Sequence, residues 1–357
     1  MKGIWKYSTL LPEMEEDYRL MLGEGDTPLV RSGHLGPALG LDHLYFKLEM
    51  TNPSGSYKDR FAASAVADLL RRGSPVCIAT SSGNTGAALA AYCAVAGMPC
   101  LLAIVDGAPA GKLKQMQAYG AETLMIKDFG KDLRVTGEVM EGLTQIAKEH
   151  GSLVQISAYC SNPVGMAGVQ TIAYEIAEEF PFVRKQVFSP AGGGGLTLAM
   201  TEGFSVWKQV HRGFVYPKVH CVQPEGNNTI SAALRDGGRE ARGIGGSTTS
   251  ISGLQVPALL DGHRVVASCR ASGGTGYVVS DELVFGCQKE LARKEGIFCE
   301  PAGAVAYAGV LQALQAGELD RTDHIICLVT GHGFKDPAGV DRMAGSGVSR
   351  YFDLAGD

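Results

Sequence analysis

A lysine at the start of a predicted helix is the residue of this sequence with the clearest chemical potential. Lys58 lies in the segment Asn52-Pro53-Ser54-Gly55-Ser56-Tyr57-Lys58-Asp59-Arg60, where the proline and glycine predict a turn and Ser56 predicts a helix cap. The apolar pattern of residues 61–70 predicts the helix itself. Because the positive end of the helix dipole disfavours a cation there, Lys58 needs either a partner such as Asp59 or a covalent role.

Two further segments predict anion sites where a helix follows a strand. They are Ser81-Ser82-Gly83-Asn84-Thr85-Gly86 and Gly192-Gly193-Gly194-Gly195-Leu196. Backbone N–H groups at a helix start attract anions, and the first segment adds hydroxyls that suit a carboxylate. The glycines of the second let the backbone wrap around a phosphate. The simpler alternatives are an ordinary cap made by Ser82 or Thr85, and a flexible turn.

A fourth segment, Thr330-Gly331-His332-Gly333-Phe334-Lys335-Asp336-Pro337, follows the last predicted strand. Ligands of open α/β sheets bind at the carboxyl ends of the strands, so Thr330 is expected to point a neutral hydroxyl into that crevice. His332 is interpreted as a loop histidine rather than a catalyst. Glu300 follows another predicted strand, and it either lines the same cleft or is simply an acid at a helix start.

The elements between these segments predict an α/β fold. From about residue 75, short β-branched apolar runs alternate with helix-length segments, which is typical of doubly wound sheets with mainly parallel strands. Predicted strands span 75–79, 99–105, 122–126, 153–156, 187–188, 219–222 and 325–329, and predicted helices span 85–97, 110–119, 131–150, 164–180, 195–211, 281–295 and 301–314. The glycine-rich stretch from Arg235 to Gly262 is irregular, and we interpret it as either a lid or linker or a disordered surface excursion.

Composition excludes several classes of protein. Hydrophobic residues make up 45% and charged residues 19% of the 357 residues, which indicates a packed core rather than a disordered chain. A net charge of −5 without a long basic block argues against nucleic-acid binding. No apolar run approaches the roughly 18 residues of a membrane span, and the N-terminus has no signal-peptide pattern. Nine cysteines without a CxxC pair indicate reduced, mostly buried thiols. We therefore expect a cytoplasmic enzyme without a metal site.

Together, the four segments resemble the fold-type II pyridoxal-phosphate enzymes, the group that contains tryptophan synthase β, threonine synthase and the serine/threonine dehydratases. The resemblance extends from about residue 5 to residue 337. It implies two doubly wound open-sheet domains with the active site between them, pyridoxal 5′-phosphate as the cofactor and an amino acid as the substrate.

The resemblance also implies a role for each motif residue. Lys58 would be the Schiff-base lysine, Asn84 would contact the ring hydroxyl of the cofactor, and Thr330 would face its pyridine nitrogen. The loop from Gly192 to Leu196 would hold the cofactor phosphate. The substrate carboxylate would be held by Ser81, Ser82, Asn84 and Thr85.

Both ends of the chain resemble threonine synthase among the subfamilies, through residues 4–7, 10–12, 22–29 and 330–337. One departure is Gly165, in Asn162-Pro163-Val164-Gly165, which stands where threonine synthases typically carry an arginine that binds the substrate phosphate. Losing such a contact costs about 1.5–3 kcal/mol unless another cation replaces it, and Arg235, Arg239 and Arg242 are candidates. The glycine run also lacks the asparagine usual in threonine synthase, and it is more similar to that of the dehydratases.

We therefore expect a pyridoxal-phosphate-dependent carbon–oxygen lyase, with conversion of O-phospho-L-homoserine and water to L-threonine and phosphate as the leading hypothesis. The alternatives are elimination from serine or threonine, a β-replacement, and a catalytically silent ligand-binding protein. The resemblance further implies a homodimer. It also implies a smaller mobile domain of residues 48–150, with Lys58 and the carboxylate loop, and a larger domain of residues 1–47 plus 151–357.

Overall fold

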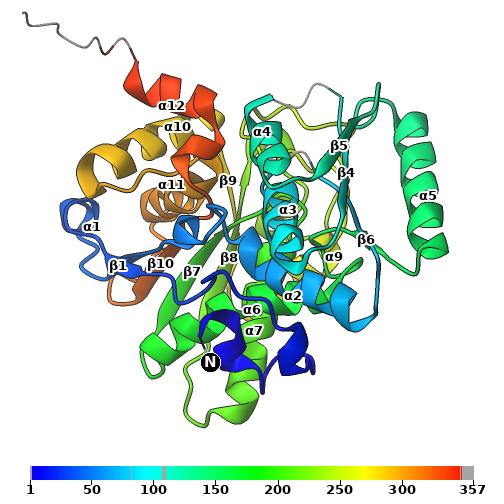
Figure 1. The fold of residues 1–357 in the computed structure, drawn as a ribbon. Helices are drawn as coiled ribbons and strands as arrows, with labels where there is room; N and C mark the ends of the chain where they lie inside the picture. Colours follow the sequence, from blue (N-terminus) through cyan, green and yellow to red (C-terminus); the bar gives the residue numbers. More distant parts are fainter. Residues whose placement is uncertain (1, 82, 107–109, 346, 348–357) are drawn as a thin grey trace, which may run out of the picture.

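Two sheets form the framework of the protein (Figure 1). The structure is a computed structural model that describes residues 2–81, 83–106, 110–345 and 347. The smaller sheet has four parallel strands in the order β5-β4-β3-β6. The larger has six strands in the order β1-β2-β10-β7-β8-β9, of which β1 and β2 pair antiparallel and the others pair parallel. The predicted α/β class with mainly parallel strands is confirmed.

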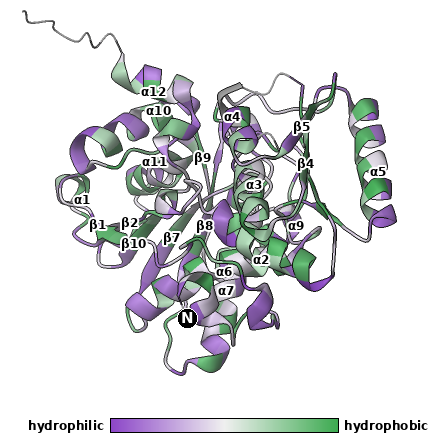
Figure 2. Ribbon diagram, viewed as in Figure 1, coloured by the Kyte–Doolittle hydropathy of each residue, from purple (hydrophilic) through white to green (hydrophobic). Residues whose placement is uncertain are grey.

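The smaller sheet is covered by helices on both faces (Figure 1). Its strands are β3 (Cys77–Thr80), β4 (Cys100–Ile104), β5 (Glu122–Met125) and β6 (Val154–Gln155). One face carries α5 (Leu133–Glu149), which alternates hydrophobic and hydrophilic residues along its length, as expected for a helix between a sheet and solvent (Figure 2). The other face carries α3 (Asn84–Ala96) and α4 (Ala110–Ala118).

The larger sheet also lies between two helical layers. Its strands are β1 (Leu29–Arg31), β2 (Leu44–Lys47), β7 (Lys185–Pro190), β8 (Lys218–Pro224), β9 (Gly276–Val279) and β10 (His324–Leu328). The layer toward the smaller sheet contains α2 (Lys58–Arg71), α6 (Pro163–Glu179), α7 (Gly195–Val210) and α9 (Gly262–Ala271). The opposite layer contains α10 (Asp281–Glu290) and α11 (Pro301–Gln315). Shorter helices are α1 (Leu35–Leu39), α8 (Ser231–Arg235) and α12 (Pro337–Ala344).

A buried network of charges anchors helix α2, which begins at Lys58. The guanidinium of Arg60 is fully buried and donates hydrogen bonds to both carboxylate oxygens of Glu49 and of Glu175, at 2.6–2.9 Å. The amine of Lys47 on β2 also donates to Glu175. Because buried charges are tolerated only when they are paired and hydrogen-bonded, this network ties α2 to α6 and to the N-terminal segment.

The sequence of helix α6 fixes where this helix begins and allows α2 to pack closely against it. Asn162 caps it by accepting a hydrogen bond from the Gly165 N–H at 2.7 Å, and Pro163 occupies its first turn. Further along, a methyl group on Gly168 would overlap the backbone carbonyl of Arg60. A glycine at this position therefore permits the close approach of the two helices that the charge network requires.

Several elements differ from the sequence prediction. Strands β1, β2 and β9 and helix α9 were not predicted, since each strand is three or four residues long and too short to show a clear period. The predicted helix 281–295 is α-helical to Glu290 and ends in a π-helical turn, Leu291–Glu295. The predicted strand before Glu300 is wrong: Cys299 forms an isolated bridge with His332, and Glu300 is the N-cap residue of α11.

A search of the described helices finds none that combines the length and the apolar character needed to cross a membrane.

The charge network predicts a stability loss that depends on pH. Burial would raise the pKa of Glu175, but the charges and hydrogen bonds of Arg60 and Lys47 outweigh it and lower this pKa to about 2 from an ordinary 4.5. The stabilisation from the ionised carboxylate is present above pH 4.5 and is lost as pH falls toward 2. We expect Glu175→Gln to cost about 3–5 kcal/mol at neutral pH, measured by urea unfolding, because it leaves buried cations unpaired.

The difference between wild type and Glu175→Gln should narrow as pH falls below about 4.5, because the wild type then loses the same charge. Glu138→Gln on α5 is the control. Its ion pair with Arg134 joins two side chains that are 61–74% exposed, so its loss should cost less than about 1 kcal/mol. A difference that stays constant across this pH range would contradict the proposed role of the charge on Glu175.

Candidate active site

A cavity of about 760 Å³ lies where the carboxyl ends of strands from both sheets meet. Every described residue that the sequence analysis selected for the site lines this cavity: Lys58, Ser81, Asn84, Thr85, Gly192, Gly193, Gly194, Gly195, Leu196 and Thr330. Ser82 lies outside the described residues. The structure thus brings the four segments to one place, although they are up to 272 residues apart in sequence (58 to 330).

Lys58 is the first residue of α2, and its amine faces the cavity. Nζ donates a hydrogen bond to the Ser157 hydroxyl at 2.8 Å and lies 4.5 Å from the centre of the Tyr57 ring. The predicted alternative, a pair with Asp59, is not formed. Asp59 is buried and instead accepts hydrogen bonds from the backbone and hydroxyl of Ser54, and burial raises the pKa of Asp59 to about 6. Lys58 therefore has an amine with neutral polar neighbours in a cavity, which suits a covalent role.

The segment between β3 and α3 combines a helix cap with a contact across the cavity. The hydroxyl of Ser81 accepts hydrogen bonds from the N–H groups of Gly83 and Gly86, at 3.3 and 3.0 Å. Ser81 therefore contributes a hydrogen-bond acceptor at the start of α3, whose N-cap residue is Gly83. The amide of Asn84 donates to the Glu300 carboxylate at 2.7 Å, which connects α3 to the start of α11.

The four glycines form the turn between β7 and α7. Gly194 has φ +95°, a backbone conformation that favours glycine, and a methyl group on Gly193 would lie 3.0 Å from Leu260. Helix α7 starts at Gly195, so the first N–H groups of this helix are available for a ligand. The turn thus forms a narrow space that backbone N–H groups polarise positively. The side chains of larger residues would fill this space.

Thr330 follows β10 and is held against the segment that contains Lys58. Its carbonyl accepts a hydrogen bond from the Tyr57 N–H at 3.1 Å. Its side chain is buried, and its hydroxyl has no hydrogen-bond partner among the described residues. A buried hydroxyl without a partner is costly, so its position on the cavity wall indicates that a ligand supplies the partner.

The irregular stretch from Arg235 to Gly262 covers the glycine turn. Ile251 and Leu254 are buried, and Val256 and Leu260 lie against Gly192 and Gly193. Seven of its residues line the cavity: Ser250, Ser252, Gly253, Leu254, Gln255, Val256 and Leu260. The alternative of a disordered surface excursion is therefore wrong, and this stretch is a wall of the site.

The sequence analysis missed several residues of the cavity. Ser157, which accepts the hydrogen bond from Lys58, comes two residues after β6. Asp106 comes two residues after β4 and also lines the cavity. The only sequence signal for both is a polar residue just after a predicted strand, at the edge where the sheet binds ligands. His332 is not part of the lining. It accepts a hydrogen bond from the Phe334 N–H at 3.3 Å, as expected for a loop histidine.

Gly165 and the three candidate arginines do not supply a cation to the cavity. A methyl group on Gly165 would lie 2.6 Å from the Phe61 ring, so an arginine there would collide with α2. Arg235 pairs with Glu318 at 2.7 Å and Arg242 with Asp236 at 2.9 Å, while Arg239 is exposed. None of these three candidate arginines is among the described residues that line the cavity. Among the described lining residues, Lys58 is the single cationic side chain.

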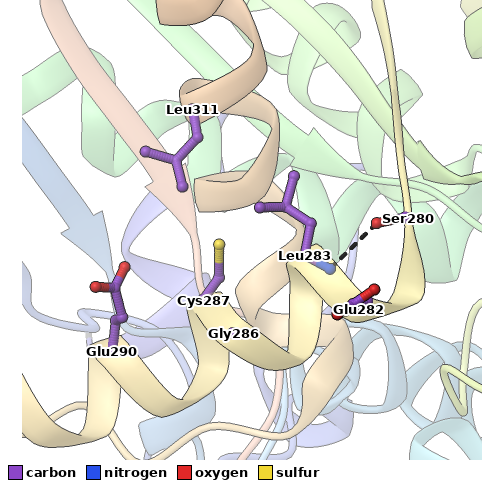
Figure 3. Close-up of a pocket in the computed structure, with 7 residues that line it drawn as sticks. All are labelled: Ser280, Glu282, Leu283, Gly286, Cys287, Glu290 and Leu311. Carbon is purple, nitrogen blue, oxygen red and sulfur yellow. Dashed lines mark hydrogen bonds between the residues drawn. The ribbon is translucent and has the colours of Figure 1, made fainter.

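A second hollow, of about 560 Å³, lies on α10 and the neighbouring α11 (Figure 3). The hollow is lined by two leucines, Leu283 and Leu311, and by two glutamates, Glu282 and Glu290 (Figure 3). Glu290 accepts a hydrogen bond from Lys294 at 2.6 Å. This hollow contains none of the predicted site residues, so the chemistry is expected at the larger cavity.

Comparisons with known proteins agree with the α/β fold and with the resemblance seen in the sequence. A family model described as "Pyridoxal-phosphate dependent enzyme" matches residues 20–331. A threonine synthase of Methanocaldococcus jannaschii is 35% identical over 99% of this chain and 85% of its own length. One of Bacillus sp. (strain ULM1) is 32% identical over 94% and 91%.

Solved structures show the same fold. A maize serine racemase superposes with a TM-score of 0.73 at 22% identity, covering 88% of this chain and 90% of its own. The processed form of threonine deaminase isoform 2 from Solanum lycopersicum gives a TM-score of 0.72 at 20% identity, covering 89% and 82%.

Because the hydroxyl of Thr330 has no hydrogen-bond partner among the described residues, we expect its removal to stabilise the protein. In protein stripped of small molecules, Thr330→Val should raise the free energy of unfolding by about 1 kcal/mol, because it removes a buried hydroxyl that has no partner. Thr171→Val is the matched control. Its hydroxyl accepts from Arg60 at 2.8 Å and donates to the Gly168 carbonyl at 2.6 Å, so its loss should cost about 1–3 kcal/mol. Equal destabilisation of both variants, measured by urea unfolding, would show that Thr330 has a partner within the protein.

Proposed function

The chain belongs to the family of pyridoxal-phosphate dependent enzymes, and we propose that it converts O-phospho-L-homoserine and water into L-threonine and phosphate. One observation carries the chemistry: the Lys58 amine, the glycine turn and the Thr330 hydroxyl face one cavity. The substrate follows from relatives named threonine synthase that are 32–35% identical over nearly the whole chain.

The residues present fit the cofactor. Gly192 to Gly195 at the start of α7 suit its phosphate, because four residues without side chains leave backbone N–H groups accessible. The unpartnered hydroxyl of Thr330 fits the ring nitrogen, and Lys58 Nζ is positioned to hold the aldehyde carbon covalently. When bound, pyridoxal phosphate supplies a conjugated ring that accepts the electron pair left on the substrate α-carbon.

Lys58 has a second role when its amine is not bound to the cofactor. Its free amine is the base that removes the proton from the α-carbon of the substrate. The hydroxyl of Ser157 accepts a hydrogen bond from this amine, so it keeps the amine directed into the cavity. The N–H groups at the start of α3, with Asn84 and Thr85, orient the substrate carboxylate.

Thr330 determines what kind of reaction follows. A threonine hydroxyl is neutral, and unlike a carboxylate it does not stabilise a proton on the ring nitrogen. With the Thr330 hydroxyl at the ring nitrogen, the bound cofactor would withdraw electron density less strongly from the α-carbon, which would favour prompt loss of a β- or γ-leaving group. This agrees with a lyase or synthase.

A second candidate, β-elimination from serine or threonine, is favoured by the scarcity of cations. A substrate phosphate would normally receive charge-assisted hydrogen bonds, each contributing about 1.5–3 kcal/mol. Among the described residues that line the cavity, Lys58 is the single cation, whereas Asp106, Glu300 and Asp336 carry carboxylates. Gly165 packs against Phe61 and leaves no space for an arginine.

The proposal includes three features that rest on the resemblance. Residues 48–150 form a smaller lobe, which closes on the substrate and excludes water. The enzyme is a homodimer, and it acts in the cytoplasm.

Lys58→Ala tests the cofactor assignment. Borohydride should fix pyridoxal phosphate covalently to wild type, with the modified peptide containing Lys58, and should fix none at this position in the variant. Turnover should fall by at least about 10²–10⁴-fold, the usual contribution of a positioned base. Lys114→Ala, which removes an exposed lysine, should match the wild type. Wild-type protein that binds no pyridoxal phosphate would support the silent ligand-binding alternative.

A substrate comparison tests the reaction. Phosphate release from O-phospho-L-homoserine and 2-oxo acid formation from L-threonine and L-serine are measured with the same holoenzyme. We expect kcat/KM for O-phospho-L-homoserine to exceed the other two by at least about tenfold, which is about 1.4 kcal/mol of transition-state stabilisation. The reverse order, with covalent attachment at Lys58 intact, would replace the synthase by a dehydratase without affecting the cofactor assignment.

A further inference from the structure

Three buried thiols meet away from the cavity, at the opposite end of strand β3. Cys77 is the first residue of β3, and Cys100 is the first residue of β4 and its partner in the parallel register. Cys93 approaches them from the last part of α3. The three sulfur atoms all lie within 4.8 Å of one another, and the reaction proposed above uses none of them.

The spacing of the sulfurs suits one central atom. Metal–sulfur bonds of about 2.3 Å place three sulfurs about 4.0 Å apart around a planar centre, and closer around a pyramidal one. The sulfurs of Cys77, Cys93 and Cys100 therefore need to contract by up to about 0.8 Å for a planar centre and by up to about 1.4 Å for a pyramidal one. In the described part of the chain, no histidine, aspartate or glutamate belongs to the cluster, so it offers sulfur alone.

The burial of the three cysteines determines which ionic charge the site can accept. The exposed fractions are 0% for Cys77, 1% for Cys93 and 7% for Cys100, so a complex with net charge would carry a large desolvation cost. Three thiolates around a monovalent or divalent ion leave a net negative charge, whereas three thiolates around a trivalent centre are neutral. We propose that Cys77, Cys93 and Cys100 form a binding site for a trivalent thiophilic centre, such as arsenic(III) supplied as uncharged arsenous acid.

The binding step is a balanced condensation without oxidation. Each thiol forms one As–S bond, one As–OH bond breaks, and the thiol proton leaves with the hydroxide as water, so three thiols release three water molecules. Cys100 is the least buried of the three residues, at 7% exposed, so its sulfur is expected to react first. The route inward is short, because the turn between α3 and β4 is at the surface, with Val95 52% exposed.

The test uses the holoenzyme in a Cys160→Ala background, because Cys160 is the exposed thiol among the nine cysteines. Sodium arsenite is the probe, with a phosphine as reductant. Intact-protein mass spectrometry should detect one arsenic per chain, and titration after rapid denaturation should detect three fewer free thiols. Binding should also raise the unfolding temperature, since the folded chain presents the three thiols together.

Matched variants assign the site. Cys93→Ala should weaken arsenite binding by at least about tenfold, because it removes one of the three bonds. Cys269→Ala removes another fully buried helical cysteine, on α9, and should leave binding unchanged. Cys100→Ala serves if Cys93→Ala does not fold, as judged by circular dichroism before arsenite is added.

Three results would overturn the proposal: no arsenic bound at all, equal binding by the Cys93→Ala and Cys269→Ala variants, or tighter binding of Zn²⁺ than of arsenite by the same three thiols. The last result would show that net charge does not select the ion.

Discussion

The pairing of Arg60 with Glu49 and Glu175 in the protein interior is the constraint on which the rest of the structure depends. A fully buried guanidinium has few tolerable positions, since its charge and its donors must all be satisfied. Arg60 is two residues after Lys58, so the network that holds Arg60 also sets where α2 begins and in which direction it runs. The lysine amine is therefore positioned by ion pairs that lie outside the cavity, which leaves the cavity itself free for chemistry.

The site is assembled from parts that each sheet contributes at its carboxyl edge. Parallel strands end on the same side, so turns that are far apart in sequence converge there. Ser81, Asn84, Thr85 and Ser157 follow strands of the smaller sheet, while the glycine turn and Thr330 follow strands of the larger. The hydroxyl of Thr330, which has no hydrogen-bond partner among the described residues, lies at this junction. A buried group of this kind lowers the stability of the empty protein, and it is retained where a ligand can satisfy it.

The same strand, β3, connects the two chemistries inferred here. Its carboxyl end leads into the proposed carboxylate loop, and its amino end carries Cys77. Soft sulfur ligands lie in the apolar interior, whereas hydroxyls, amides and backbone N–H groups line the cavity. The separation follows from burial, because neutral thiols are tolerated in a core without partners, whereas charged or strongly polar groups are tolerated there only when they are paired.

The sequence by itself determined the α/β class, and it predicted ligand-binding turns and roles for Lys58, Asn84, the glycine run and Thr330, because these signals are local. A helix start, a run of glycines or a polar turn after a strand is recognisable within about ten residues. Only the tertiary structure decided the contacts of Lys58 with Ser157, Asn84 with Glu300 and Arg60 with Glu175, and the meeting of three cysteines. It also showed that Gly165 faces Phe61 and that the irregular stretch 235–262 is a wall of the cavity. Such contacts depend on how the helices and strands are arranged in three dimensions, and no local sequence pattern specifies that arrangement.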